Sequence, residues 1–496
     1  MLFNSVRFLI FFPAVVFVYA FIPRKIRALW LLVASYFFYM SWNAKYALLI
    51  ALSTVVTWAG GLVLSSVENR SRAERRAVLA LVFTVNLGIL FFFKYFRFAL
   101  DTISSILKLF GGGAIHSGLD VLLPVGISFY TFQALGYCAD VYHGRVQAER
   151  NLLHYALFVS FFPQLVAGPI ERSGNLLKQI DDIENINIRN YDQVISGLLL
   201  MLWGYFQKVV IADRIAILAD TVFDEPARFG TTALLIGALA FTLQIYCDFG
   251  AYSSIAIGAA RVMGFRLSDN FNTPYFAESI ADFWHRWHIS LSTWFRDYVY
   301  IPLGGNRCSR VRRYLNLMIT FLLSGLWHGA AWTYVIWGGL HGFYQIAGDF
   351  LSAPLRRIGD WLKVNRAAES WHLLRMALTF ALTSFAWIFF RAASLSDALF
   401  YIGRLFTRPD PWSLFDGSIY ALGLDVAQMH VLAFSLALLF LVDLLRARRH
   451  QEPGDFLKEQ NLWFRFAVPL MMILVILVYG AYGVDFDSAR FIYFTF

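Results

Sequence analysis

One histidine stands inside a long apolar stretch of this chain. His328 follows Leu326 and Trp327 in a segment, residues 315–345, that is otherwise mostly apolar, aromatic or glycine. An ionisable side chain at membrane depth is costly, and it usually faces a cavity or a partner group. His328 is therefore a candidate catalytic residue, with the alternative that it only hydrogen-bonds a neighbouring helix.

The chemistry open to such a histidine is general-base catalysis. Burial disfavours the charged imidazole, and a neutral imidazole can take the proton of an alcohol as its oxygen attacks an acyl carbon. The sequence contains no G-x-S-x-G motif, no H-E-x-x-H motif and no obvious cysteine nucleophile. Direct acyl transfer assisted by a base therefore fits better than a serine acyl-enzyme on this chain. We expect no metal, because carboxylates are sparse near the histidines.

A second pair of histidines lies upstream. His285 and His288 are three residues apart, so we expect them to share a helix face, with Ser292 next along it. His288 is a candidate for a second catalytic or gating role; the alternative is an interfacial histidine bonded to the backbone. His341 follows His328 by 13 residues and should lie on the opposite helix face, in a structural or cavity-lining role.

Composition places the chain in a membrane. Of its 496 residues, 58% are hydrophobic and 15% are charged, and apolar runs recur along almost the whole length. A charge inside such a run, Asp248, could orient a polar group in a cavity. The net charge of +9 reflects arginines at the ends of apolar runs, which set topology, rather than a nucleic-acid surface. The three cysteines form no paired framework and no ligand spacing.

The elements that must position these residues are membrane helices. Basic connections at residues 24–27 and 70–76 predict an external amino terminus and cytoplasmic loops. Residues 122–170 and 250–264 carry proline or glycine interruptions, so we expect partial or re-entrant helices around a cavity in this zone. Residues 271–313 mix aromatic and charged side chains, as an interfacial helix does. The predicted spans are 5–22, 28–42, 46–65, 77–95, 192–212, 232–248, 373–390, 430–445 and 463–482.

The segment around His328 should enter the membrane and return. Arg307–Arg313 and Arg356–Arg366 flank it, and if both are cytoplasmic the stretch between them is a hairpin. The arm 315–326 would be roughly 18 Å of helix, about half the bilayer, which places the turn near the midplane. The carboxyl end, residues 491–496, should lie outside.

Several motifs resemble the membrane-bound O-acyltransferase family. They include Phe283–Asp297, Leu303–Arg307 and Leu326–Gly329, together with residues 123–132 and 162–169. Within that family the chain is most similar to the bacterial branch that acetylates cell-surface polysaccharides such as alginate. Two positions depart from the branch: His285 replaces an arginine, and residues 247–254 lose a serine and a second aspartate of an F-D-F-S-G-Y-S-D run.

The resemblance implies one membrane domain over residues 1–496, with its signature region at 271–347. It implies an all-α ring of about 11–12 transmembrane helices with re-entrant or partial helices around a central cavity. The family's signature histidine maps onto His328 and its second histidine onto His288. The donor-binding residues are not identified by the motifs; Trp327, Asp248 and Arg296 are the candidates.

The resemblance also implies an activity. We expect an O-acyltransferase that passes acetyl groups from cytoplasmic acetyl-coenzyme A across the bacterial inner membrane to an exported, alginate-like polysaccharide. Periplasmic proteins of the SGNH-hydrolase type would be its partners. The alternatives are a peptidoglycan O-acetyltransferase, an enzyme of the teichoic-acid D-alanyl transfer type and, from the residues alone, a transporter with broken helices at the midplane.

Overall fold

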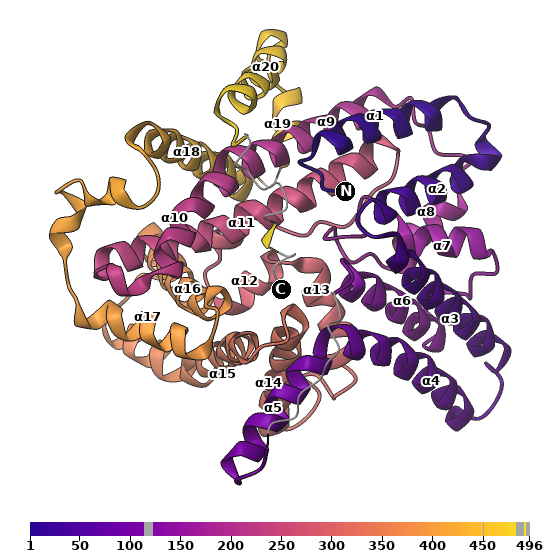
Figure 1. Cartoon of the computed structure of the whole chain (residues 1–496), viewed down its shortest axis with the longest axis horizontal. Coiled ribbons are helices and arrows are strands. Elements are labelled where there is room, and N and C mark those ends of the chain that lie inside the picture. Colours follow the sequence, from indigo (N-terminus) through magenta and orange to yellow (C-terminus); the bar gives the residue numbers. More distant parts are fainter. Residues whose placement is uncertain (114–122, 450, 483–490, 493–496) are drawn as a thin grey trace. The chain divides into compact units, whose positions relative to one another are not determined.

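The chain folds into helices throughout the part that the structure describes. A computed structural model describes residues 1–113, 123–449, 451–482 and 491–492 (Figure 1). In these ranges there is no β-strand, only an isolated antiparallel bridge between Phe271 and Trp287. The predicted all-α class is confirmed. The expectation that residues 491–496 lie outside the cell stays a prediction, and four of these residues, 493–496, fall outside the described ranges.

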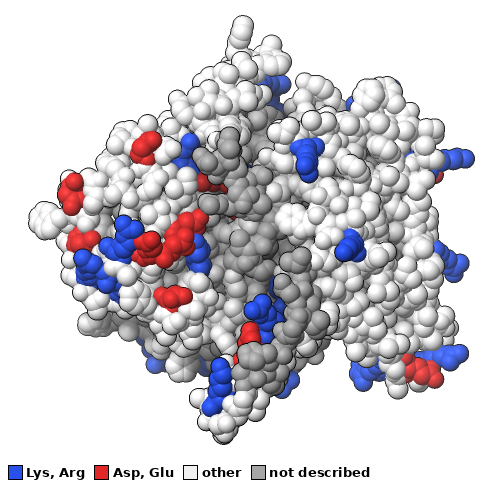
Figure 2. All heavy atoms as spheres, viewed as in Figure 1, with Lys and Arg blue, Asp and Glu red and all other residues white. Residues whose placement is uncertain are grey.

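Seven of the described helices are long and apolar enough to cross a membrane. Most of the face drawn in Figure 2 consists of uncharged residues, as expected where lipid rather than water surrounds a protein. The predicted multi-pass membrane protein is confirmed, while the number of about 11–12 crossings stays a prediction. Some of these seven stretches join two or more of the helices labelled below, and they are Ala44–Ser66, Arg72–Leu109, Tyr191–Asp224, Thr231–Val262, Glu369–Arg391, Val426–Arg449 and Leu462–Tyr479.

The chain divides into two compact units. Unit 1 comprises residues 1–198 and 256–268, and unit 2 comprises residues 199–255 and 269–496. Two helices, α9 (Tyr191–Tyr205) and α11 (Thr231–Val262), contribute to both units. The other helices of unit 1 are α1 (Val6–Phe21), α2 (Arg27–Met40), α3 (Ala47–Ser66), α4 (Arg72–Leu90), α5 (Phe96–Leu109), α6 (Ile127–Tyr142), α7 (Leu152–Ser160) and α8 (Lys178–Asp181).

Unit 2 contains the residues singled out by the sequence. Its helices are α10 (Asp213–Asp224), α12 (Ile280–Arg286), α13 (Ile289–Phe295), α14 (Arg310–His328), α15 (Trp332–Trp361), α16 (Glu369–Arg391), α17 (Leu395–Thr407), α18 (Val426–Arg449), α19 (Pro453–Lys458) and α20 (Leu462–Tyr479).

The glycine- and serine-rich segment 250–264 differs from its prediction. We expected the span to end at residue 248, but α11 continues without a break to Val262. Small residues are tolerated inside a helix where another backbone approaches closely. Within unit 1, a Cβ on Gly197 of α9 would lie 2.7 Å from the carbonyl oxygen of Gly258. The small residues therefore serve close helix packing rather than a helix end.

The interfacial helix expected within 271–313 is in fact broken into several pieces, of which α12 and α13 contain the candidate histidines. α12 ends at Arg286 and α13 begins at Ile289. Between them His288 has a φ of 43°, in the left-handed region that few residues other than glycine adopt. This conformation turns the chain sharply, so the side chains before and after the break cannot follow one helical periodicity.

The helical hairpin predicted around His328 is present, while the position of its turn near the membrane midplane stays a prediction. α14 packs against α15, with the turn at residues 329–331. Its first arm starts at Arg310 rather than Leu315. The contact leaves no room for a side chain: a Cβ on Gly338 would lie 2.2 Å from the carbonyl oxygen of Phe321. Glycine at such positions lets two helices approach each other within a membrane.

Candidate active site

His328 is the last residue of α14 and lies inside the protein. Its side chain is 3% exposed, so it faces neither lipid nor bulk water. Aromatic rings surround it edge to face: the ring centroids of Trp327, Trp337 and Phe390 lie 4.9, 5.0 and 5.4 Å from that of the imidazole. The hairpin supplies the two tryptophans and α16 supplies Phe390. Close-packed rings on three sides hold the imidazole in one orientation and leave little room for water.

His288 is held by hydrogen bonds. It is fully buried, and its Nδ1 lies 3.0 Å from the side-chain oxygen of Asn270. The same oxygen accepts a hydrogen bond from Ser290 Oγ at 2.9 Å, while the Asn270 amide nitrogen donates to Ser253 Oγ at 3.0 Å. Asn270 therefore presents an acceptor to His288, which requires the proton on Nδ1 and the lone pair on Nε2.

The electrostatics favour the neutral form of His288. Burial lowers its pKa from 6.5 to about 3, because the charged imidazolium loses its hydration. His288 lies outside the seven membrane-spanning helices. At neutral pH this residue is therefore an uncharged imidazole with a fixed tautomer, which is a form suited to accept a proton or to orient a polar group.

The structure brings the two candidate histidines together. The ring centroids of His288 and His328 are 6.3 Å apart, and the ring of Trp327 lies within 5.8 Å of the first and 4.9 Å of the second. Trp327, predicted as a donor-binding candidate, is 3% exposed and packs against both. This pair, His288 and His328, is the candidate active site.

The expectation that His285 and His288 share a helix face is wrong. His285 lies in the last turn of α12 and lines a cavity of about 320 Å³, whereas His288 lies in the break between α12 and α13 and is fully buried. Ser292 and Arg296, the third donor-binding candidate, line the same cavity. Ser324, one turn before His328 on α14, also lines it. Neither histidine of the pair lines this cavity itself, but Ile289, the residue after His288, does.

The placement of His341 on the opposite face from His328 is also wrong. The two residues lie on different helices, so a single helical periodicity does not relate them. Both rings contact Trp337, at centroid distances of 5.0 Å for His328 and 5.1 Å for His341. Trp284 donates a hydrogen bond to Nδ1 of His341 at 3.2 Å. His341 therefore supports the rings around the site, in agreement with a structural role.

Asp248 belongs to a buried group of charges that we call the Lys208 cluster: Lys208, Asp213 and Asp248. The ammonium of Lys208 lies 2.8 Å from Asp213 and 2.6 Å from Asp248. Asp248 also accepts a hydrogen bond from the backbone N–H of Ile492 at 2.9 Å. Asp248 thus connects Ile492, the last residue that the structure describes, to α11. Asp248 itself does not contact the histidines. Its neighbour Phe249 does, with a ring centroid 4.7 Å from His288.

The sequence reasoning missed Asn270 and Lys208. Lys208 is a charge inside an apolar run and had the same signal as Asp248. Asn270 had none, because a polar residue in a connection between helices is ordinary and only the folded chain buries it beside His288. No group of three or more potential metal ligands occurs among the described residues, and the absence of a metal stays an expectation.

Comparisons with known proteins identify the family. The model of the membrane-bound O-acyltransferase (MBOAT) family matches residues 148–367. The probable alginate O-acetylase AlgI of Pseudomonas aeruginosa is 42% identical over 401 residues, 80% of this chain and 73% of the relative. The chain belongs to the MBOAT family. It is accordingly a multi-pass membrane O-acyltransferase.

Two other similar proteins carry different names. The peptidoglycan O-acetyltransferase of Helicobacter pylori is 36% identical over 429 residues, which is 80% of this chain and 78% of that protein. The teichoic acid D-alanyltransferase of Bacillus subtilis is 28% identical over 287 residues, 55% of this chain and 70% of its own length. The names of the three relatives share the transfer of an acyl group and differ in the polymer, which is alginate, peptidoglycan or teichoic acid.

Proposed function

We propose that this MBOAT protein passes acetyl groups from cytoplasmic acetyl-coenzyme A across the inner membrane for O-acetylation of an exported, alginate-like polysaccharide. The observation that carries the proposal is the meeting of His328 and His288 in the protein interior, 6.3 Å apart, beside a cavity lined by hydroxyl groups and Arg296. The similarity to alginate O-acetylases supports acetyl as the acyl group and a polysaccharide as the acceptor.

In this proposal His328 is the general base. An acceptor hydroxyl oxygen attacks the thioester carbonyl carbon, and His328 takes the hydroxyl proton as the new C–O bond forms. The C–S bond breaks, and His328 returns the proton to the sulfur, so that coenzyme A leaves as a thiol. The aromatic rings around His328 exclude water, which protects the thioester from hydrolysis.

His288 is proposed as the supporting residue. Its Nδ1 is committed to Asn270, so Nε2 is the atom that can accept a proton or a hydrogen bond during the reaction. Arg296 is the cation that could meet the donor's phosphates in the neighbouring cavity. Trp327 would fix the positions of the two histidines by packing against both rings. Asp248 would affect the site only indirectly, by holding α11 in place.

The cellular setting completes the proposal. The enzyme lies in a bacterial inner membrane with its amino terminus in the periplasm, and periplasmic SGNH-type proteins finish the modification of the glycan. Of the basic residues in the first connection, Arg24 and Lys25 are exposed and suit a cytoplasmic loop, while Arg27 is buried and bonds the carbonyl oxygen of Ile186. Peptidoglycan is the second candidate acceptor, because a peptidoglycan O-acetyltransferase is also similar over 80% of the chain.

The test uses the purified protein in lipid nanodiscs with acetyl-coenzyme A labelled in the acetyl group. We expect release of free coenzyme A thiol and transfer of label to an added glycan or partner protein by the wild type but not by His328→Ala. His154→Ala, a histidine change in unit 1, is the matched control and should retain activity. Normal transfer by His328→Ala would refute the role of His328, and transport of intact label without thiol release would favour a carrier.

A further inference from the structure

A second cavity, larger than the one beside His285, lies between α12, α14, α15 and α16. Its volume is about 540 Å³. It does not include His288 or His328, and the proposed acyl transfer makes no use of it. The two cavities share part of one wall, to which Ala281, Tyr300, Asn306, Leu317 and Gln345 contribute.

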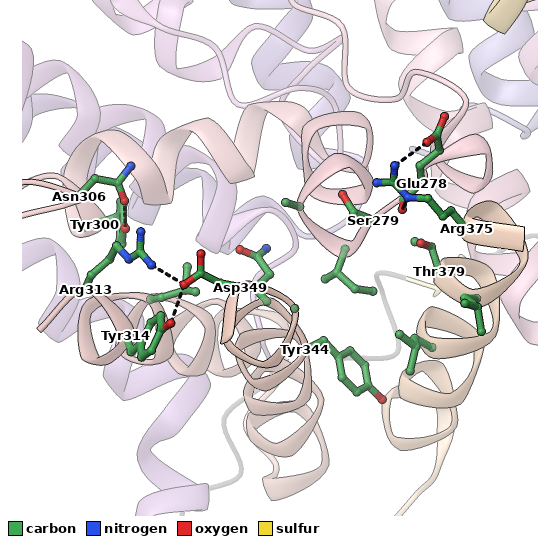
Figure 3. Close-up of a pocket in the computed structure, with 17 residues that line it drawn as sticks. Glu278, Ser279, Tyr300, Asn306, Arg313, Tyr314, Tyr344, Asp349, Arg375 and Thr379 are labelled. Carbon is green, nitrogen blue, oxygen red and sulfur yellow. Dashed lines mark hydrogen bonds and ion pairs between the residues drawn. The ribbon is translucent and has the colours of Figure 1, made fainter. Parts of the chain in front are cut away.

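Charged groups stand on opposite walls of this cavity (Figure 3). On one wall Arg313 of α14 pairs with Asp349 of α15 at 2.5 Å. On the other, Arg375 of α16 pairs with Glu278 at 3.1 Å. All four side chains are partly exposed, between 31% and 43%, so a ligand can reach them.

Arg375 has more N–H groups than its two contacts with Glu278 use, and each of the two carboxylates has a second partner besides its arginine. Arg375 uses Nε on the carbonyl oxygen of Glu278 and Nη1 on its carboxylate, out of five N–H groups in a guanidinium. The carboxylate of Glu278 also contacts His372, and that of Asp349 accepts from Tyr314 as well as Arg313. An anionic group with several oxygens, such as a phosphate, suits these remaining guanidinium donors.

Apolar side chains continue from the charged end towards the middle of α16. Leu378 and Leu382 line the cavity, and they lie on the same face as Arg375 at steps of three and four residues. They are 56% and 41% exposed on a helix that is long and apolar enough to span a membrane. From Arg375 to Leu382 the rise is roughly 10 Å. The cavity is thus polar at one end, apolar at the other, and open towards the lipid-facing side of α16.

We propose that this cavity binds a membrane phospholipid, with the phosphate at Arg375 and an acyl chain along Leu378 and Leu382. The rest of the headgroup extends towards Arg313 and Asp349 on the opposite wall. A soluble phosphate ester would satisfy the guanidinium but make no contact with the exposed leucines, so the apolar half of the cavity favours a lipid. A lipid in this place packs against the wall shared with the smaller cavity. The proposal concerns binding and stands apart from the acyl-transfer reaction.

The experiment measures lipid binding to the delipidated protein in detergent by native mass spectrometry. Dioleoylphosphatidylethanolamine is the probe, and dioleoylglycerol, with the same chains and no phosphate, is compared with it. We expect one tight phosphatidylethanolamine site in the wild type and about tenfold weaker binding of dioleoylglycerol. Arg375→Gln should weaken the phospholipid site about tenfold, and Leu378→Trp, which fills the apolar half, should abolish it.

Two matched variants control for charge and bulk. Arg357→Gln changes an exposed arginine of α15 outside the cavity, and Leu374→Trp changes an exposed leucine of α16 that does not line it; both should bind as the wild type does. Unchanged binding in Arg375→Gln and Leu378→Trp would overturn the proposal. Displacement of the lipid by acetyl-coenzyme A would also overturn it, by assigning the cavity to the thioester donor. Displacement by inorganic phosphate alone would leave an anion site without a lipid and have the same consequence.

Discussion

The histidine pair and the Lys208 cluster are both buried in unit 2, yet they satisfy their polar groups by different means. His328 and His288 are held by aromatic rings and by one amide, Asn270. The Lys208 cluster joins one ammonium to two carboxylates. A neutral imidazole can be replaced without leaving an uncompensated charge, whereas the cluster depends on all its ions being present. The first group is thus suited to chemistry and the second to holding helices in place.

The largest expected effect is on catalysis at the histidine pair. His328→Gln keeps a polar side chain of similar size but removes the base, and general-base catalysis is worth about 10²–10⁴ in rate. We expect acetyl transfer to fall by at least that lower factor while thermal unfolding in detergent stays close to wild type. If His328→Gln instead lowered the unfolding temperature as much as a change in the Lys208 cluster does, His328 would be a structural residue.

The next effect falls on folding at the Lys208 cluster. Lys208→Met leaves Asp213 and Asp248 buried without their cation, and breaking a buried ion pair costs about 3–5 kcal/mol. We expect low yield and a lower unfolding temperature. The triple variant Lys208→Met, Asp213→Asn, Asp248→Asn removes all charges together and should recover much of the stability. Failure of the single change to destabilise the protein contradicts the structural role.

Changes at Asn270 have a smaller expected effect, and they act on His288 rather than on His328. Asn270→Leu removes the acceptor for His288 Nδ1 and Ser290, and leaving buried donors unsatisfied costs about 1–3 kcal/mol. We expect activity to drop roughly tenfold or more, because the tautomer of His288 is no longer fixed. Asn270→Asp keeps an acceptor, favours the protonated imidazole, and should shift the pH–rate profile rather than abolish activity. An identical pH profile in both variants would show that Asn270 acts only through packing.

The smallest effect is a dependence of stability on pH. The pKa of His288 is about 3 in the folded protein and near 6.5 in the unfolded chain, so between these values the unfolded state binds a proton that the folded state does not. Stability therefore falls as pH decreases below 6.5, by at most about 1.4 kcal/mol per pH unit from this group. His288→Phe should show a shallower decline in unfolding temperature from pH 7 to pH 5. Equal declines in the two proteins would contradict the lowered pKa.

Sequence alone was sufficient for the class of protein and for the helical hairpin that contains His328, while the catalytic role of His328 stays a prediction. Apolar runs predict membrane helices because backbone polar groups must be satisfied inside lipid, and this constraint acts locally. The basic segments at each end of 315–345 predicted the return of the chain, and α14 and α15 confirm it. His328 was a candidate because an ionisable residue in such an apolar run is costly and usually has a function. The motifs around it were specific enough to indicate the family.

The surroundings of the histidines were decided only by the tertiary structure. The spacing of His285 and His288 suggested one helix face, but the left-handed φ of His288 breaks the helix between them, and no periodicity encodes such a break. Asn270 reaches His288 across 18 residues, and Trp337 joins His328 to His341 from the other arm of the hairpin. Burying the charge of Lys208 or of Asp248 alone would cost free energy, but both can be buried because packing places the ammonium 2.6 Å from the carboxylate. Pairing and hydrogen bonding of buried groups depend on distances in the folded chain, and local sequence does not specify those distances.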